Sequence, residues 1–151
     1  MSLSQHYKWI LMFLFASGNS KMKYNEPVIG KTRLVKELFL LRETQKIKDM
    51  YTFEPDKYGP SSDELIKDLD CLIEKELVKE NQSAYGTKYL LTPEGIKKAQ
   101  ELFIGDVKIK IENVKRNYNE MPLNQLLVYV YSAFPKYTTK SVIKEQLRNI
   151  I

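Results

Sequence analysis

The sequence predicts a mainly α-helical domain with one small β-hairpin, and three observations near the middle of the chain support this α+β class. Residues 61–78 repeat leucine and isoleucine at three- and four-residue spacing, as an amphipathic helix does. In the segment 77–91, which reads LVKENQSAYGTKYLL, two strand-like pieces flank a polar turn. Thr92 then suits the N-cap of another helix, and Pro93 suits its first position. This order is typical of the second half of a winged helix-turn-helix domain.

The size and composition fit a small globular protein. The chain has 151 residues and a mass of 17.7 kDa, so we expect a winged-helix domain over residues 1–104 and a C-terminal helical extension over residues 105–151. The extension is expected to pack on the core or on a second subunit. With 43% hydrophobic and 28% charged residues the composition is that of a soluble domain. The net charge of +5 permits anionic partners without requiring them.

An apolar run, Trp9–Ala16, predicts a buried first helix over residues 4–17. The run is too short to span a membrane, which takes roughly 20 apolar residues. Lys8 ahead of it and small residues behind it resemble a signal peptide in outline, but a single lysine makes a thin positive region. We therefore favour a helix central to the core and expect no membrane association.

The segment after this helix predicts a loop and a second helix. Residues 21–30 are rich in turn-forming types, with a short extended piece at Val28 and Ile29. Thr32 is the expected N-cap of a helix over residues 33–43, whose basic side chains fall mostly away from its apolar face.

A short strand and a helix start are expected next. The alternating residues 50–55, MYTFEP, predict a strand ahead of a turn at Tyr58–Pro60. Ser61 with Glu64 three residues later forms the pattern of a capping box, so Ser61 is the expected N-cap of the central helix.

Further helices are expected in the C-terminal third. Five apolar positions at three- and four-residue spacing predict a helix over residues 104–118, against a local alternation that would suit a strand. A strongly apolar helix follows Pro122 and stops at Pro135, and Ser141 is the expected cap of a last helix over residues 142–151.

Catalytic and metal chemistry find little support. The chain holds one cysteine, Cys71, and one histidine, His6, so it forms no intrachain disulfide and no structural zinc site of the usual Cys/His type. Cys71 is expected to be a half-buried hydrophobe and His6 a surface residue. We expect no enzyme activity, no metal and no cofactor, and a reducing, cytoplasmic location.

The tripeptide GKT at residues 30–32 invites comparison with a phosphate-binding loop. That loop needs a glycine five residues before the second glycine, where this chain has Asn25. The residues before it do not form the buried strand that such a loop follows, so we reject a nucleotide site.

Four phrases of the chain form a shared pattern, namely GKTRLVKELFLL, FEPDKYGPSSDELIKDLDCLIEKELV, YLLTPEG and LLVYVYSAFPKYTTKS. Together they resemble the YwgA-like family of small bacterial and archaeal winged-helix proteins, and the match covers roughly residues 10–145. Most of these residues form turns, caps and apolar helix faces. The resemblance implies a winged-helix fold and an association with transcription regulation, and it supplies no catalytic residues to carry over.

The charge pattern qualifies the expectation of duplex DNA binding. The helix Ser61–Val78 carries an excess of four negative charges, which phosphates would repel. Residues 21–50 and 105–151 each carry an excess of four positive charges. We therefore expect a transcriptional regulator that binds DNA through the second helix and the hairpin wing, with backbone contacts from Lys31, Arg33, Lys36, Arg42, Lys79, Tyr85 and Lys88.

The alternative is a winged-helix-derived module for protein interaction or dimerisation that does not bind DNA. The apolar helix after Pro122 is hydrophobic on nearly every side and must be buried against something. A second subunit is one candidate and the first helix of the same chain is the other. The residues expected at a homodimer interface are Leu126, Val130, Tyr131 and Phe134.

Overall fold

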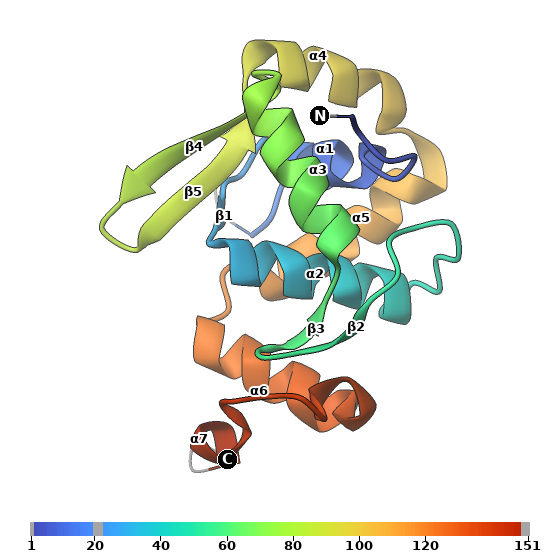
Figure 1. The fold of residues 1–151 in the computed structure, drawn as a ribbon. Helices are drawn as coiled ribbons and strands as arrows, with labels where there is room; N and C mark the ends of the chain where they lie inside the picture. The colour runs from blue at the N-terminus through green and yellow to red at the C-terminus, as the bar shows by residue number, and fades with distance from the viewer. Residues whose placement is uncertain (1, 20–22, 149–151) are drawn as a thin grey trace.

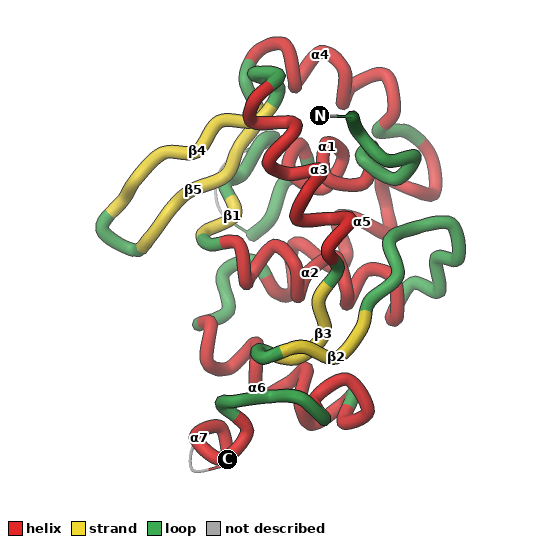
Figure 2. Tube along the Cα trace, in the orientation of Figure 1, coloured by secondary structure: helices red, strands yellow, loops and turns green. Residues whose placement is uncertain are grey.

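The computed structural model describes residues 2–19 and 23–148 and confirms a mainly helical α+β fold with a small antiparallel sheet. The elements, coloured along the chain in Figure 1, are α1 (Lys8–Phe15), β1 (Val28–Ile29), α2 (Lys31–Thr44), β2 (Glu54–Asp56), β3 (Gly59–Ser61), α3 (Asp63–Glu74), β4 (Val78–Ser83), β5 (Gly86–Leu91), α4 (Pro93–Leu102), α5 (Gly105–Tyr118), α6 (Leu123–Ala133), the 3₁₀ helix η1 (Pro135–Thr138) and α7 (Lys144–Arg148). The strands lie in two places, the three-stranded sheet of β1, β4 and β5, whose β4–β5 hairpin projects from the body, and the small β2–β3 hairpin (Figure 2).

Helix α1 lies at the centre of the molecule, as its apolar sequence predicts, although it is shorter than the expected 4–17. Its residues from Ile10 to Phe15 are buried. At its C-terminal end, the carbonyls of Phe13, Leu14 and Ala16 accept hydrogen bonds from Lys115 Nζ at 2.9, 3.0 and 2.7 Å. The last carbonyls of a helix lack partners within it, so this one ammonium group satisfies the end of α1 from α5.

Helix α2 is buried on every side along most of its length, because α5, α6 and β3 all pack against it. The expected N-cap at Thr32 is wrong: the helix begins at Lys31, and its N-cap is Gly30, whose φ of 97° only glycine adopts readily. A side-chain cap is absent there, and the turn is fixed instead by the Gly30 N–H, which donates to the Thr87 carbonyl at 2.8 Å.

The three-stranded sheet has the order β1-β5-β4 and is antiparallel throughout. Val28 pairs with Tyr89 and Val78 pairs with Leu91, and these four side chains point into the core. Because side chains alternate along a strand, the next residues face the other side of the sheet. This confirms the expected hairpin and the short extended piece at residues 28–29.

Helix α3 crosses the front of the molecule in Figure 1 and is amphipathic as predicted. Its N-cap is Ser62, whose hydroxyl accepts from the Leu65 N–H at 3.3 Å, so the expected cap at Ser61 is one residue too early. Ser61 pairs with Glu54 in the β2–β3 hairpin instead. That hairpin also begins later than the strand expected at residues 50–55.

The helices α4 and α5 are where the sequence predicts them. Thr92 caps α4 by accepting from the Gly95 N–H at 3.1 Å, and Pro93 occupies the first position. Residues 105–118 form a helix and not a strand.

The C-terminal helices pack on the core of the same chain. Ile111 and Val114 of α5 belong to the same buried cluster as α1, and so do Leu126 and Val130 of α6. Helix α7 begins at Lys144, two residues later than expected, and residues 149–151 of the expected last helix lie outside the described residues. The described chain ends beyond α6, at the opposite end of the molecule from its N-terminus (Figure 1).

Candidate functional site

The β4–β5 hairpin, which we call the wing, projects from the body and carries part of the predicted contact set (Figure 1). Lys79 pairs with Leu90, and Lys88 pairs with both Asn81 and Ile29, so both lysines lie on the sheet face opposite the core. Tyr85 at the tip is 84% exposed. Its turn is fixed by the Ser83 hydroxyl, which donates to the Gly86 carbonyl at 2.7 Å and accepts from the Tyr85 N–H at 3.2 Å.

Lys31 lies beside the wing. It is exposed and is the first residue of α2. It follows Gly30, whose N–H donates to the Thr87 carbonyl of β5. The structure therefore brings four of the seven predicted contact residues to one region, namely Lys31, Lys79, Tyr85 and Lys88.

Two of the other three predicted contacts, Arg33 and Lys36, point inward, which corrects the expectation that they fall away from the apolar face of α2. Arg33 is 8% exposed, and its Nη1 donates to the Tyr118 carbonyl at 3.0 Å. Lys36 is 2% exposed, and its Nζ donates to the Pro60 carbonyl at 3.0 Å. Burial lowers the pKa of Lys36 to about 8. Both side chains are covered because α5, α6 and the β2–β3 hairpin close over the side of α2 that periodicity leaves polar.

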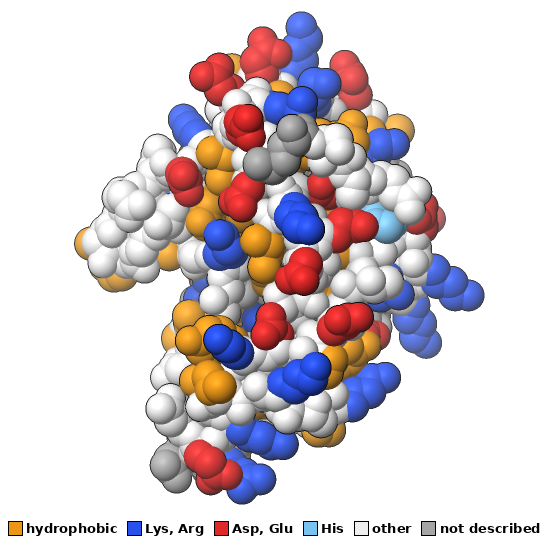
Figure 3. Space-filling model, viewed as in Figure 1, with side chains coloured by type: hydrophobic (Ala, Val, Ile, Leu, Met, Phe, Trp, Pro, Cys, Tyr) orange, Lys and Arg blue, Asp and Glu red, His pale blue; other side chains and the backbone are white. Residues whose placement is uncertain are grey.

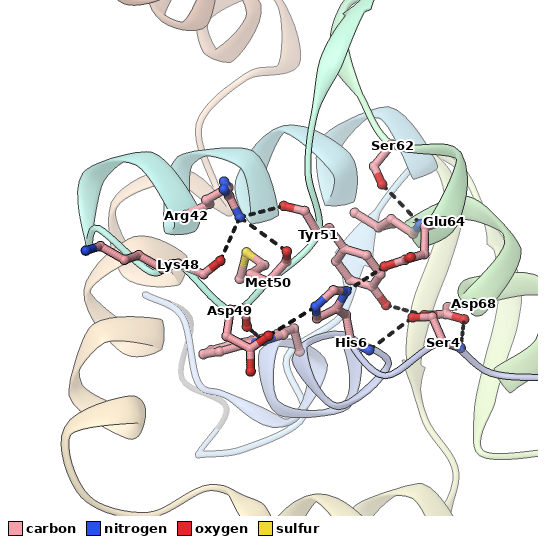
Figure 4. Close-up of polar contacts among 12 residues, drawn as sticks. Ser4, His6, Arg42, Lys48, Asp49, Met50, Tyr51, Ser62, Glu64 and Asp68 are labelled. Carbon is pink, nitrogen blue, oxygen red and sulfur yellow. Dashed lines mark hydrogen bonds and ion pairs between the residues drawn. The ribbon is translucent and has the colours of Figure 1, made fainter.

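Arg42 serves as a clamp for the loop that follows α2. Its Nη1 donates to the carbonyls of Lys48, Met50 and Tyr51 at 3.3, 3.2 and 3.0 Å (Figure 4). This bonding holds the loop against the helix.

Two acidic side chains of α3 bind the N-terminal segment of the chain (Figure 4). Asp68 is buried and accepts from the Ser4 N–H at 2.8 Å, the Ser4 hydroxyl at 2.5 Å and the Tyr51 hydroxyl at 2.7 Å. Burial, followed by the bond to Asp68, raises the pKa of Tyr51. Asp70, in contrast, is exposed, so Asp68 and Asp70 lie on different faces as expected.

His6 lies between two carboxylates, and the expectation of a surface residue is wrong. Its Nδ1 is 2.6 Å from Glu64 Oε1, its Nε2 is 3.3 Å from Asp49 Oδ1, and its side chain is 14% exposed. The ring also contacts the edge of Tyr51 with centroids 5.6 Å apart. No hydroxyl or thiol is bonded to the imidazole among the described residues, so the cluster fastens the N-terminal segment to α3 and does not form a nucleophile–base pair.

The outward face of α3 remains acidic after these contacts are taken into account. Asp63, Asp70 and Glu74 are exposed there, with Lys67 as the basic residue between them. The front of the molecule in Figure 3 accordingly shows acidic and basic side chains mixed over this helix. This face lacks the positive charge that a duplex groove requires.

The residues expected at a dimer interface lie inside their own chain, which corrects that expectation. Leu126 and Val130 are 0% exposed, and Tyr131 is 8% exposed with its hydroxyl 2.6 Å from the Ser141 hydroxyl. The Phe134 ring meets the Phe39 ring edge-on with centroids 5.0 Å apart. The sequence analysis left two candidates for burying α6, a second subunit and the first helix of the same chain. In the structure α2 of the same chain packs against α6.

A pocket of about 590 Å³ opens between the wing, the start of α2 and the α5–α6 connection. In Figure 3 it corresponds to the notch between the projecting wing and the body below it. One wall is polar, because Asn119 Nδ2 donates to Glu26 Oε2 at 2.7 Å and to the Pro27 carbonyl at 3.0 Å. The residues that line it are Glu26, Pro27, Ile29, Arg33, Tyr85, Lys88, Asn119, Glu120, Met121, Pro122 and Leu123.

Sequence reasoning missed this pocket because its lining comes from four separate segments. Arg33 was singled out by its charge alone, and nothing in the spacing of Asn119 or Leu123 signals a shared wall with the wing.

Cys71 is 1% exposed, more buried than expected. Within residues 2–19 and 23–148, no group of three or more His, Cys, Asp or Glu side chains is arranged to hold a metal ion.

None of the described helices is both long and apolar enough to cross a membrane. Comparison with known proteins adds no relative: no protein-family model, no curated protein and no solved structure matches the chain.

Proposed function

We propose that this protein is a winged-helix DNA-binding regulator that contacts duplex DNA with its wing and the start of α2, and not with α3. The observation that carries the proposal is the connectivity. A helix, a short strand, a second helix, the small β2–β3 hairpin, a third helix and the wing follow in order, and the first strand pairs with the last in the sheet order β1-β5-β4. This order and this pairing support a winged-helix core, and so does the resemblance to YwgA-like proteins. Fold alone is an analogy, so the charges must decide the mode of contact.

The charges favour the wing as the contacting element. Lys79 and Lys88 share the outer face of the sheet, and Lys31 is exposed where α2 meets β5. Tyr85 projects at the tip, where an aromatic side chain can pack against sugar or base edges. Three lysines neutralise about three phosphates, so binding would depend on salt and carry little sequence information.

The test is a mobility shift with a duplex of about 30 base pairs, because three phosphate contacts predict affinity about 40-fold weaker at about 200 mM than at about 50 mM salt. A triple variant with Lys31→Glu, Lys79→Glu and Lys88→Glu should abolish the shift. The matched control replaces Lys48, Lys97 and Lys98, which are exposed and lie away from the wing, with Glu. Equal loss in both triple variants, or no shift of the unmodified chain at low salt, would overturn the proposal.

The second candidate is a protein-interaction module without DNA binding. The specific observation in its favour is the acidic outer face of α3, with Asp63, Asp70 and Glu74 exposed. Such a face suits a basic partner surface better than phosphate. A chain that fails to shift duplex DNA at low salt would leave this candidate in place of the first.

A further inference from the structure

We infer that the pocket between the wing and the α5–α6 connection binds a small amphipathic monocarboxylate. The volume of about 590 Å³ lies within the range of small-molecule sites, and apolar walls with a few polar groups are the usual composition of such sites. The inference concerns this pocket alone and holds whether or not the protein binds DNA.

Arg33 supplies the group that would hold the carboxylate. Its side chain is 8% exposed, and within the described residues its Nη1 donates to the Tyr118 carbonyl at 3.0 Å. A guanidinium carries five N–H donors. Among the described residues, the buried side-chain atoms that lack a hydrogen-bond partner belong to Glu37 and Asn119. No Arg33 nitrogen is among them, so the Arg33 donors that make no hydrogen bond are accessible to solvent. Arg33 also lines the pocket, and a guanidinium can bind a carboxylate with two parallel bonds, so we assign the carboxylate of the ligand to Arg33.

Lys88 and an apolar wall complete the site. Lys88 lines the pocket from the wing and adds a second positive charge to its lining. Ile29, Met121 and Leu123 line the apolar side, and Leu123 is 41% exposed. A hydrocarbon body placed there would cover apolar surface that now faces water.

Two carboxylates in the lining limit the charge of the ligand. Glu26 is 4% exposed and bonded to Asn119, and Glu120 is exposed at the rim. They offset the two cations, so the site as a whole is close to neutral. A single carboxylate can pair with Arg33 at little cost, whereas a phosphate dianion would meet repulsion from both acidic side chains.

Four probes of eight carbon atoms each test the charge requirement by isothermal titration calorimetry on the full chain. Octanoate should bind with one site and a dissociation constant on the order of 0.1 mM. Octyl phosphate, 1-octanol and octylamine should each bind at least about tenfold more weakly, since they carry two negative charges, none, or one positive charge. Equal affinity for octanoate and 1-octanol, or tighter binding of octylamine, would overturn the inference.

Two variants and a matched control locate the site. Lys88→Met removes a charge and keeps the aliphatic stem, and we expect octanoate binding about tenfold weaker. Leu123→Asp places a negative charge on the apolar wall and should abolish binding. Lys79→Met changes the neighbouring strand of the same wing outside the pocket and should leave the affinity unchanged. Thermal melting confirms folding, and octanoate affinity that is the same in all three variants would place the ligand elsewhere and refute the assignment.

Discussion

Two fully buried side chains of opposite charge, Lys115 and Glu37, set the electrostatics of the interior. The Lys115 ammonium is satisfied by its three carbonyl partners at the end of α1. Both Glu37 carboxylate oxygens are buried without a hydrogen-bond partner within the described chain. Burial raises the pKa of Glu37 to about 8 and lowers the pKa of Lys115 to about 7, and the attraction between the two charges opposes each shift. The fold therefore disfavours the ionised form of Glu37.

The pH dependence of stability should report on Glu37. Its pKa rises from 4.5 unfolded to about 8 folded, so the folded state binds the extra proton between these values. Stability therefore falls as pH rises through that window, at on the order of 1 kcal/mol per pH unit. Glu37→Gln removes this dependence. The unfolding free energy of the variant, relative to that of the wild type, should therefore increase steadily from about pH 5 to about pH 7. Urea unfolding at several pH values measures both curves.

The window ends near pH 7 because Lys115 begins to titrate there. The pKa of Lys115 is about 7 in the folded state and 10.5 in the unfolded state. Above about pH 7 the folded state has therefore lost a proton that the unfolded state still holds, so the contribution of Lys115 to stability rises with pH. The control is Glu101→Gln, an exposed carboxylate on α4. Parallel curves for wild type and Glu37→Gln would show that Glu37 is ionised in both states and would contradict the assignment.

At the scale of single elements, the end of α3 carries conformational strain. Glu76 has a φ of 59°, and its N–H donates to the Ile73 carbonyl at 3.0 Å while the Leu77 N–H donates to the Leu72 carbonyl at 3.0 Å. These bonds form a Schellman motif, in which glycine is preferred at the position of Glu76. We expect Glu76→Gly to raise the unfolding free energy by about 1 kcal/mol, since it relieves the left-handed backbone and removes a carboxylate from a helix C-terminus.

The same substitution two residues earlier is the control. Glu74 is the last residue of α3 and has helical geometry, so Glu74→Gly should lower the unfolding free energy by about 1 kcal/mol. Thermal or urea unfolding of both variants measures the pair. A loss of stability in both would mean that the left-handed backbone at Glu76 is not strained.

Elements whose signals are local could be predicted from the sequence. Thr92 and Pro93 start α4, and the polar turn closes the wing, because each depends on residues a few positions apart. Two adjacent serines gave the wrong cap for α3, since which one leaves the β2–β3 hairpin depends on pairing with Glu54. The start of α2 was also missed, because Gly30 is fixed by a bond to β5 that lies far along the chain.

At the scale of the whole molecule, the candidate site was harder to predict because it depends on what covers α2. Periodicity gives one apolar face, but α5 and α6 bury the other as well, and Arg33 and Lys36 turn inward as a result. The apolar character of Leu126 and Val130 showed correctly that α6 must be buried, but it could not say by which chain. Exposed residues such as Lys79 and Tyr85 were placed well, since a projecting hairpin has few neighbours.

The C-terminal helices should therefore be required for folding, contrary to a division into a domain over residues 1–104 and an extension. A chain truncated after residue 104 loses Ile111, Val114, Leu126 and Val130 from the core shared with α1. It also loses Lys115, which leaves the last carbonyls of the most buried helix without partners. We expect no cooperative thermal transition by circular dichroism. A chain truncated after Ser141 is the control, because α7 packs in a separate small cluster through Leu147 and its loss should lower the melting temperature without abolishing the transition. A cooperative melt of the shorter chain would show that residues 1–104 form a complete core and that α5 and α6 only cover it.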